Sequence, residues 1–372
     1  MNKSDTYVTI TVLIYGGTKL DKGLIAVDIG TTNLEVMLCD TMHNVIECRS
    51  ERNEQRRFGA DVAARICAAA DGHGDDMRVS ILSQICALIT GLITSHPGTD
   101  VTGIAIAGNT TMLHLLMGYD CSGLGMYPFT PVSLAEIHTT THGLISDYHK
   151  STDPAFPDIP VTILPGISAY LGADIYAGAI ACGFGRNEKP SVLIDLGTNA
   201  EIIIGCKDHI LTASAAAGPA FESGRIFKGT EGIEMLHRLL TLGVIDRTGL
   251  MSEEYFEQPA QKNIRRLQLA KAAIRAAIGI LLSKYGIDED RLDRIYISGN
   301  FGNNINEDAC IAVGMLPEGF RGKLIAAGNT VLDGCITYML DESSRIPVSM
   351  FEEVILANEP DFNDILMNSI DL

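Results

Sequence analysis

Two short segments of the sequence place an acidic residue, a glycine and hydroxyl side chains directly after an apolar run. They are Asp28–Thr32 (DIGTT) and Asp195–Asn199 (DLGTN). Glycine lets a ligand approach the backbone closely, and the threonines offer hydroxyl and N–H donors to phosphate oxygens. An aspartate would repel phosphate unless a cation lay between them, and Mg²⁺ with retained waters fits that place. We therefore predict phosphate-binding loops at Gly30, Thr31, Thr32 and at Gly197, Thr198, Asn199, with Mg²⁺ held by Asp28 and Asp195 as the catalytic carboxylates.

The surroundings of the two segments are also duplicated. Ile25–Thr32 aligns with Val192–Asn199, and in each copy two further β-rich runs follow. A repeat at this scale indicates two related structural units, each with its loop at the end of a buried strand. Two loops of this kind would bind the β- and γ-phosphates of a nucleotide, where catalysis depends on positioning and charge neutralisation. The alternative is that both are ordinary turns between strands, with no ligand.

Other glycine-containing turns extend the expected site. Ser298–Gly302 (SGNFG) follows a predicted strand, and its glycines would let a flat ring approach the backbone. Gly218 and Glu222 belong to a loop in which Glu222 either contacts ribose or adenine or starts a helix. Asn109 and Thr110 either touch the terminal phosphate or a partner, or act as N-cap residues, and Thr110 or Thr111 is expected to cap the helix that follows. Around adenosine we expect Gly218, Glu222, Gly299, Asn300 and Gly302.

Apolar periodicity predicts an α/β chain with the order strand, turn, strand, strand, helix in both halves. The second half continues into helices near 231–241 and 261–285. We expect an N-terminal extension over 1–23 and a first lobe over 24–165. Residues 119–160, rich in Pro, Thr, Ser and His, are expected to form a surface excursion of that lobe, and 166–372 a second lobe.

Composition excludes several classes of protein. The formal net charge is −18 and no Lys/Arg block is present, which is untypical of a nucleic-acid binder. The nine cysteines contain no C-x-x-C pair, so no zinc ribbon or iron–sulfur cluster is expected. Their wide spacing favours reduced thiols in a cytoplasmic protein. The apolar patch near the N-terminus is too short and too polar for a membrane span.

The three loops in this order resemble the superfamily of acetate and sugar kinases, heat-shock ATPases and actin. The resemblance implies duplicated ribonuclease-H-like lobes, each with a five-stranded sheet, around an interlobe nucleotide cleft. A closer similarity, from about Leu24 to the C-terminus, is to the ATPase part of the reductive activators of corrinoid proteins. The segments that carry it begin at Ala107 (AGNTTMLH), Pro165 (PGISAYLGAD), Ile194 (IDLGTNAE), Ala217 (AGPAFE), Ile297 (ISGNFG), Gly314 (GMLP) and Ala327 (AGN).

This resemblance implies an ATP hydrolase that uses Mg²⁺ and drives the reduction of a corrinoid protein from cob(II) to cob(I). The corrinoid protein would be part of a methyltransferase system. The family draws its electron from a ferredoxin-like iron–sulfur domain, for which this chain lacks the cysteines, so a separate electron donor is expected. After Glu222 the chain also lacks the family's Cys-Gly-Met-Arg segment. Neither a membrane nor nucleic acid is an expected partner, and a homodimer remains open. The alternatives are a kinase for a sugar or carboxylate, or a nucleotide-gated binding protein with little turnover.

Overall fold

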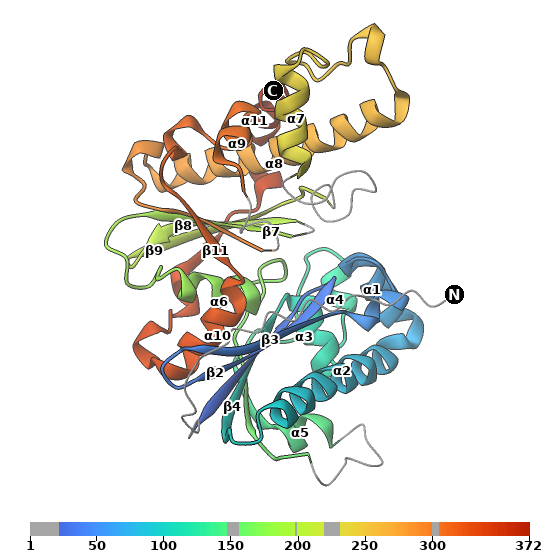
Figure 1. The fold of residues 1–372 in the computed structure, drawn as a ribbon, viewed down its shortest axis with the longest axis vertical. Coiled ribbons are helices and arrows are strands. Elements are labelled where there is room, and N and C mark those ends of the chain that lie inside the picture. The colour runs from blue at the N-terminus through green and yellow to red at the C-terminus, as the bar shows by residue number, and fades with distance from the viewer. Residues whose placement is uncertain (1–21, 147–155, 198, 219–230, 300–304) are drawn as a thin grey trace. The chain divides into compact units, whose positions relative to one another are not determined.

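The computed structural model describes residues 22–146, 156–197, 199–218, 231–299 and 305–372. The chain forms two compact units (Figure 1). The first ends at Ala181 and also takes in Val331–Arg345, and the second consists of Cys182–Thr330 and Ile346–Leu372. The division therefore falls later than the boundary expected at residue 165, because the helix that follows this point packs on the first sheet.

The first unit contains a six-stranded sheet in the order β3-β2-β1-β4-β6-β5. Strands β1 to β3 form an antiparallel meander, β4 and β6 run parallel to β1, and β5 runs antiparallel to β6. The bounds of its strands are β1 Gly23–Ile29, β2 Asn33–Asp40, β3 Val45–Arg52, β4 Val101–Gly108, β5 Ile137–Thr140 and β6 Pro160–Ile163.

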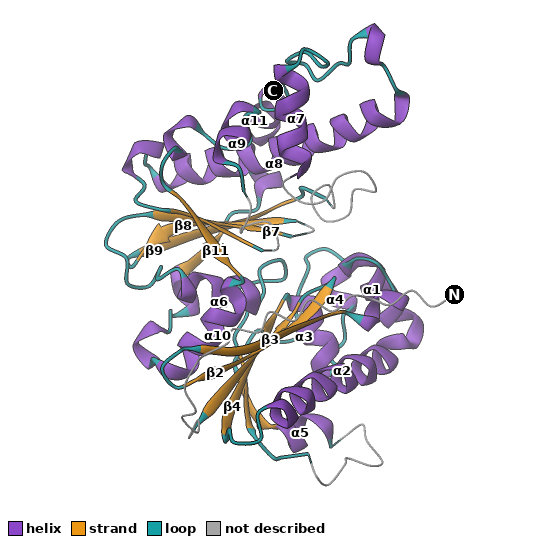
Figure 2. Cartoon of the chain, in the orientation of Figure 1, coloured by secondary structure: helices purple, strands orange, loops and turns teal. Residues whose placement is uncertain are grey.

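Helices cover both faces of this first sheet (Figure 2). Alternate side chains of β1, such as Val27 and Ile29, pack in one apolar cluster with α2 and α3. On the other face α10 packs against α6, where a Cβ at Gly334 would lie 2.0 Å from Ala177 O. The helices of this unit are α1 Val62–Ala68, α2 Gly74–Ser95, α3 Thr110–Met117, α4 Ser122–Gly125, α5 Thr141–Ile145, α6 Ala173–Ala181 and α10 Thr330–Leu340.

The second unit repeats the design, with a sheet in the order β11-β10-β7-β8-β9-β12. Strands β7 to β9 form the antiparallel meander, β10 and β11 run parallel to β7, and β12 runs parallel to β9. The elements are β7 Ser191–Leu196, β8 Ala200–Cys206, β9 His209–Ala215, α7 Glu231–Thr241, α8 Gln258–Tyr285, β10 Ile295–Ser298, α9 Glu307–Ala312, β11 Leu324–Gly328, β12 Phe351–Glu353 and α11 Phe362–Asn368. Its main apolar cluster joins one face of the sheet to α7, α8, α9 and α11.

Five strands of each sheet share one order and one set of directions, which confirms the predicted duplication of a ribonuclease-H-like α/β unit. Each sheet has a sixth edge strand beyond the five expected. In the first unit this strand is β5, which lies inside the segment 119–160 expected to be a surface excursion. The expectation was wrong at Leu124, Leu144 and Ile159, which are buried in the core, whereas Met126, Tyr127 and Val132 in the middle of the segment are exposed.

The stretch Val62–Ser95 is long and apolar enough to cross a membrane by length and composition. In the structure it is interrupted at Gly72, whose φ of 95° ends the regular helix. Its apolar side chains, among them Met77, Ile81 and Leu88, are buried in the first core. The stretch therefore serves as a core helix of this unit.

Candidate nucleotide-binding site

Asp28 and Asp195 occupy equivalent places in the two sheets. Each is the penultimate residue of a central strand, β1 or β7, and each leads directly into a predicted loop. Both face away from the main apolar cluster of their unit, because their neighbours Ile29 and Leu196 enter those clusters. The two aspartates therefore lie at the same strand end and on the same kind of face in each unit.

In the first unit, Asp28 belongs to a row of polar residues across the meander. Asp28 pairs with Glu35 on β2, and Glu35 pairs with Ser50 on β3. The Ser50 hydroxyl donates to Glu35 Oε1 at 3.3 Å. Two carboxylates directly opposite each other on antiparallel strands are unfavourable without a nearby cation.

The second unit has the same row. Asp195 pairs with Glu201 on β8, and Glu201 pairs with Ser214 on β9, whose hydroxyl donates to Glu201 Oε1 at 3.3 Å. On its other side Asp195 accepts a hydrogen bond of 2.9 Å from the Ser298 hydroxyl on β10. The oxygen donors of this row are of the kind that Mg²⁺ prefers, and so are those of the first.

Asp28 and Asp195 were identifiable from the sequence, whereas Glu35 and Glu201 were missed there. Each glutamate lies across a hairpin from its aspartate, so the pairing depends on the register of two strands. A recognisable signal was the shared order of aspartate, turn and glutamate in the two copies. That order predicts a cross-strand pair only once the loop length is known.

Burial and hydrogen bonding act on the Asp195 carboxylate in opposite directions. Burial raises the pKa of Asp195, and the hydrogen bond from Ser298 opposes this rise. In the first unit burial raises the pKa of the Cys335 thiol on α10 well above its ordinary value, and the Asp28 carboxylate raises it further. Asp28 therefore lies near the face covered by α10, in a region where an unneutralised charge is costly.

The first loop is held by contacts to two other parts of its unit. Asn109 Nδ2 donates to Thr31 Oγ1 at 3.0 Å, while the Asn109 side-chain oxygen accepts from Met112 N as the N-cap of α3. The expected cap at Thr110 or Thr111 was wrong by one or two positions, because Asn109 has the extended backbone of an N-cap and Thr110 is already helical. Thr110 Oγ1 instead donates to Ser168 O at 2.7 Å.

Two of the expected glycines are required by the backbone. A Cβ at Gly30 would lie 2.8 Å from Asn33 O, and one at Gly299 would lie 2.6 Å from Leu196 O. Gly299 also has a φ of 86°, in the left-handed region. Gly197 is different, since a Cβ there would meet only Asn199 O at 3.6 Å. Gly299 therefore ties the Ser298 turn closely to the second loop.

Gly218 has a φ of 68°, and a Cβ built there would meet none of the described atoms within 4 Å. The remaining expected positions, Thr198, Glu222, Asn300 and Gly302, lie outside the described residues. Among the residues that are described, no group of three or more His, Cys, Asp or Glu side chains converges as a metal site. Mg²⁺ bound through one or two carboxylates per row and through phosphate oxygens does not require such a group.

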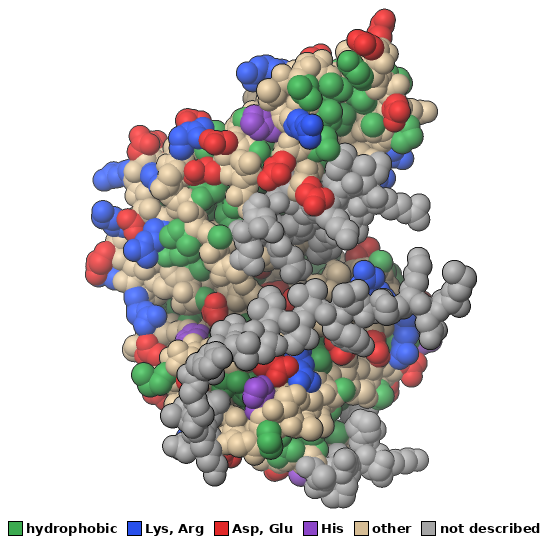
Figure 3. Space-filling model, viewed as in Figure 1, with side chains coloured by type: hydrophobic (Ala, Val, Ile, Leu, Met, Phe, Trp, Pro, Cys, Tyr) green, Lys and Arg blue, Asp and Glu red, His purple; other side chains and the backbone are tan. Residues whose placement is uncertain are grey.

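On the face drawn in Figure 3, the described Lys and Arg side chains are interspersed with Asp and Glu, without a continuous basic block. This agrees with the net charge of −18. Phosphate binding by this chain would therefore depend on loop backbone, hydroxyl groups and a metal ion more than on a basic surface.

The duplicated sheets, each with an aspartate at the end of its central strand, define an actin-like ASKHA fold. Two family models match the chain. The RACo middle region matches residues 24–187, and the C-terminal domain of RACo, the ASKHA domain, matches residues 189–235 and 257–372. The chain belongs to the RACo family, and the family boundary near residue 188 lies close to the boundary between the two compact units.

Individual relatives agree with this assignment. The corrinoid activation enzyme RamQ of Eubacterium limosum is 27% identical over 422 residues, covering 92% of this chain and 69% of RamQ. A [Co(II) methylated amine-specific corrinoid protein] reductase of Methanosarcina barkeri is 26% identical over 243 residues, covering 49% of this chain and 45% of the reductase. The solved structure of a reductive activator for corrinoid, iron-sulfur protein matches with a TM-score of 0.81 and 25% identity, over 96% of this chain and 67% of that one.

Proposed function

We propose that this chain binds Mg-ATP through its two aspartate loops and hydrolyses it. The observation that carries the proposal is the matched pair of rows, Asp28 with Glu35 and Asp195 with Glu201, each beside a loop of glycine and hydroxyl residues. Asp28 and Asp195 hold Mg²⁺ through its waters. Gly30, Thr31 and Thr32 bind phosphate oxygens in the first loop, and Gly197, Thr198 and Asn199 do so in the second. The bound Mg²⁺ neutralises phosphate charge during hydrolysis.

The adenosine end of the nucleotide is assigned to glycine-rich turns of the second unit. Gly299 supports this, because its backbone passes so close to Leu196 O that a side chain there is excluded. We propose that Gly299, Asn300 and Gly302 flank adenosine, and that Gly218 and Glu222 contribute from the neighbouring loop. For Gly218 the left-handed backbone conformation is the supporting observation.

We further propose that ATP hydrolysis by this chain is coupled to activation of a corrinoid protein. Support comes from its relatives, which are a corrinoid activation enzyme, a corrinoid protein reductase and a reductive activator. In this proposal the corrinoid protein is the partner, and its cobalt is the group that is reduced. In this proposal the electron comes from a separate donor, because the nine cysteines form no C-x-x-C pair of the kind that binds an iron–sulfur cluster.

Calorimetric titration of the purified chain with Mg-ATP tests the first part. We expect saturable binding that needs Mg²⁺ and that weakens at least tenfold in Asp28→Asn, equivalent to about 1.4 kcal/mol. Asp75→Asn, on the exposed first turn of α2, is the matched control and should bind as the unaltered chain does. Absence of binding at millimolar nucleotide would contradict the proposal.

The second part is tested by adding a corrinoid protein and a chemical reductant, with and without ATP. We expect an ATP-dependent change in the cobalt absorption spectrum. A spectrum that is the same with and without ATP, from a chain that does bind Mg-ATP, would exclude coupling to corrinoid reduction. Phosphate transfer to a sugar or carboxylate in a parallel panel would instead identify a small-molecule kinase.

A further inference from the structure

The backbone carbonyl groups of the first loop accept hydrogen bonds from two buried residues, Asn53 and Arg65. Asn53 Nδ2 donates to Gly30 O at 2.8 Å, and Asn53 N donates to Thr32 O at 2.9 Å. Between them, Arg65 Nη2 donates to Thr31 O at 2.5 Å. Three consecutive carbonyl oxygens of the loop are thus bound by a single buried pair, Asn53 and Arg65.

This pattern determines which way the loop presents its N–H groups. In a planar trans peptide the C=O and the following N–H point in opposite directions. Holding the carbonyls of Gly30 and Thr31 inward therefore turns the N–H groups of Thr31 and Thr32 toward the opposite side. Successive N–H groups on one side form an anion-binding nest, which a phosphate would occupy.

Arg65 is an unusual residue to find at this place. Its side chain is 0% exposed, and its other contacts are Gly59 O at 3.1 Å, Gln55 Oε1 at 3.4 Å and Met112 Sδ at 3.0 Å. These partners are neutral groups, not carboxylates. Burial lowers the pKa of Arg65 to about 10, opposed by the charge of Asp61, so the guanidinium remains cationic at neutral pH. A buried cation with neutral partners is costly unless the ligand supplies negative charge.

We propose that Arg65 is the positioning residue of the first phosphate loop, which it orders through the Thr31 carbonyl and supports with a positive charge beneath the bound phosphates. The assignment rests on the proposed binding of Mg-ATP. Arg65 acts through the loop and does not touch the nucleotide. Asn53 completes the same support through the carbonyls of Gly30 and Thr32.

The test compares Arg65→Met and Arg65→Lys with Arg78→Met. Arg78 is the matched control, because it is a buried arginine of the same unit that packs against Gly118 at the end of α3. Affinity and stoichiometry for Mg-ATP are measured by calorimetry, with adenosine as a second probe. If Arg65 had a purely structural role, its replacement would lower the fraction of protein able to bind, or would weaken the binding of Mg-ATP and adenosine equally. If Arg65 positions the phosphate loop, its replacement weakens the binding of Mg-ATP alone.

We expect R65M to bind Mg-ATP at least tenfold more weakly than the unaltered chain, with adenosine binding unchanged. R65K keeps the charge, but three donors on a single nitrogen cannot reproduce the four contacts of the planar guanidinium, so its affinity should lie between the two. If R65M does not fold, R65K decides the matter by the same criterion. Affinity for Mg-ATP within twofold of the unaltered chain in the folded variants would overturn the role of Arg65. Failure of the unaltered chain to bind Mg-ATP would instead overturn the proposed function.

Discussion

Replacing Asp195 with asparagine should make the ligand-free protein more stable and the nucleotide-bound protein less stable. Asp195 is a half-buried carboxylate whose pKa is raised by desolvation, against a hydrogen bond of 2.9 Å from Ser298. Asparagine has nearly the same shape and keeps an oxygen that can accept this bond. The substitution therefore removes the charge while leaving the packing of β7 and β10 in place.

The sign of the effect follows from the raised pKa of Asp195. A carboxyl group with a raised folded pKa contributes stability below its unfolded pKa, and that contribution is lost as the pH rises through the folded pKa. At neutral pH the charged aspartate therefore lowers the free energy of unfolding. We expect D195N to raise the free energy of unfolding by about 1 kcal/mol at pH 7, which lies within the range common for single stabilising substitutions.

Bound nucleotide should reverse this order. A ligand at one hundred times its Kd stabilises the folded state by about 2.7 kcal/mol. If Asp195 holds Mg²⁺, the variant loses most of this stabilisation. The unaltered chain should then be the more stable of the two by roughly 1.7 kcal/mol, the difference between the stabilisation by ligand and the gain from the substitution.

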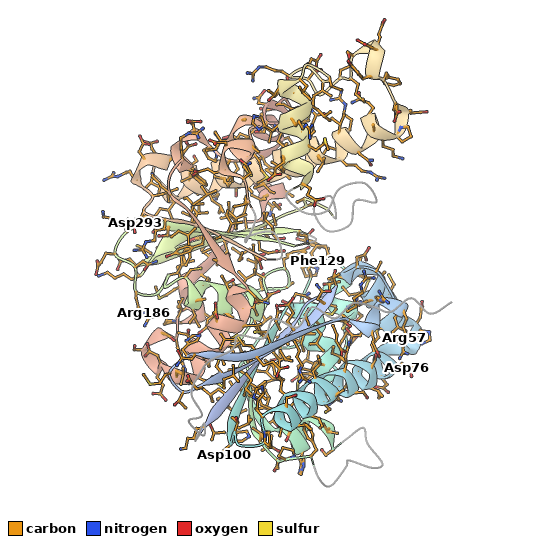
Figure 4. The ribbon with its side chains drawn as sticks, in the orientation of Figure 1. Arg57, Asp76, Asp100, Phe129, Arg186 and Asp293 are labelled. Carbon is orange, nitrogen blue, oxygen red and sulfur yellow. The ribbon has the colours of Figure 1, made fainter. Side chains whose placement is uncertain are left out.

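Urea unfolding followed by circular dichroism measures both quantities, since the chain has no tryptophan for a fluorescence assay. The curves are fitted with separate transitions if the two units unfold separately. Asp293→Asn, an exposed aspartate labelled in Figure 4, is the matched control and should change neither value by more than about 0.5 kcal/mol. The reasoning is refuted if D195N is less stable without nucleotide, or if Mg-ATP stabilises it as much as the unaltered chain.

Three further substitutions test the structure at other places. Gly299→Ala should lower the free energy of unfolding by more than the roughly 1–2 kcal/mol of left-handed strain, because its Cβ would lie 2.6 Å from a backbone oxygen. Gly286→Ala is the control: this glycine has a φ of 76° and open space around its Cβ position, so the substitution should cost only that strain. Urea unfolding measures both. Gly334→Ala forces α10 away from α6 and should lower the stability of the first unit by about 1–3 kcal/mol. In the control Gly279→Ala the nearest atom to the new Cβ lies at 3.8 Å, so thermal unfolding should show a neutral or stabilising effect. Burial lowers the pKa of Lys271 to about 8, so the unfolded state binds more protons than the folded state between pH 8 and 10.5. The free energy of unfolding, relative to that of Lys271→Met, should therefore rise with pH across that window. A difference that does not change with pH would contradict this prediction.

Local sequence pattern was sufficient to predict most of the individual elements. The strands before Asp28 and Asp195 are short apolar runs ended by an Asp-x-Gly turn, and the structure confirms them as β1 and β7. The order of strands and helices in each half was also predictable, because the same periodicities occur twice. Register, edge strands and unit boundaries were not, since β5 and α10 join the first unit through contacts with residues far along the chain.

By itself, then, the sequence determined the two aspartate loops and the duplicated α/β unit around them, because both are written in consecutive residues. Only the tertiary structure placed Glu35 opposite Asp28 and Glu201 opposite Asp195, because strand register brings them together. It alone also placed Arg65 beneath Thr31. In the sequence Arg65 has the pattern of a solvated helical side chain, and its burial depends on packing between segments that are 34 residues apart.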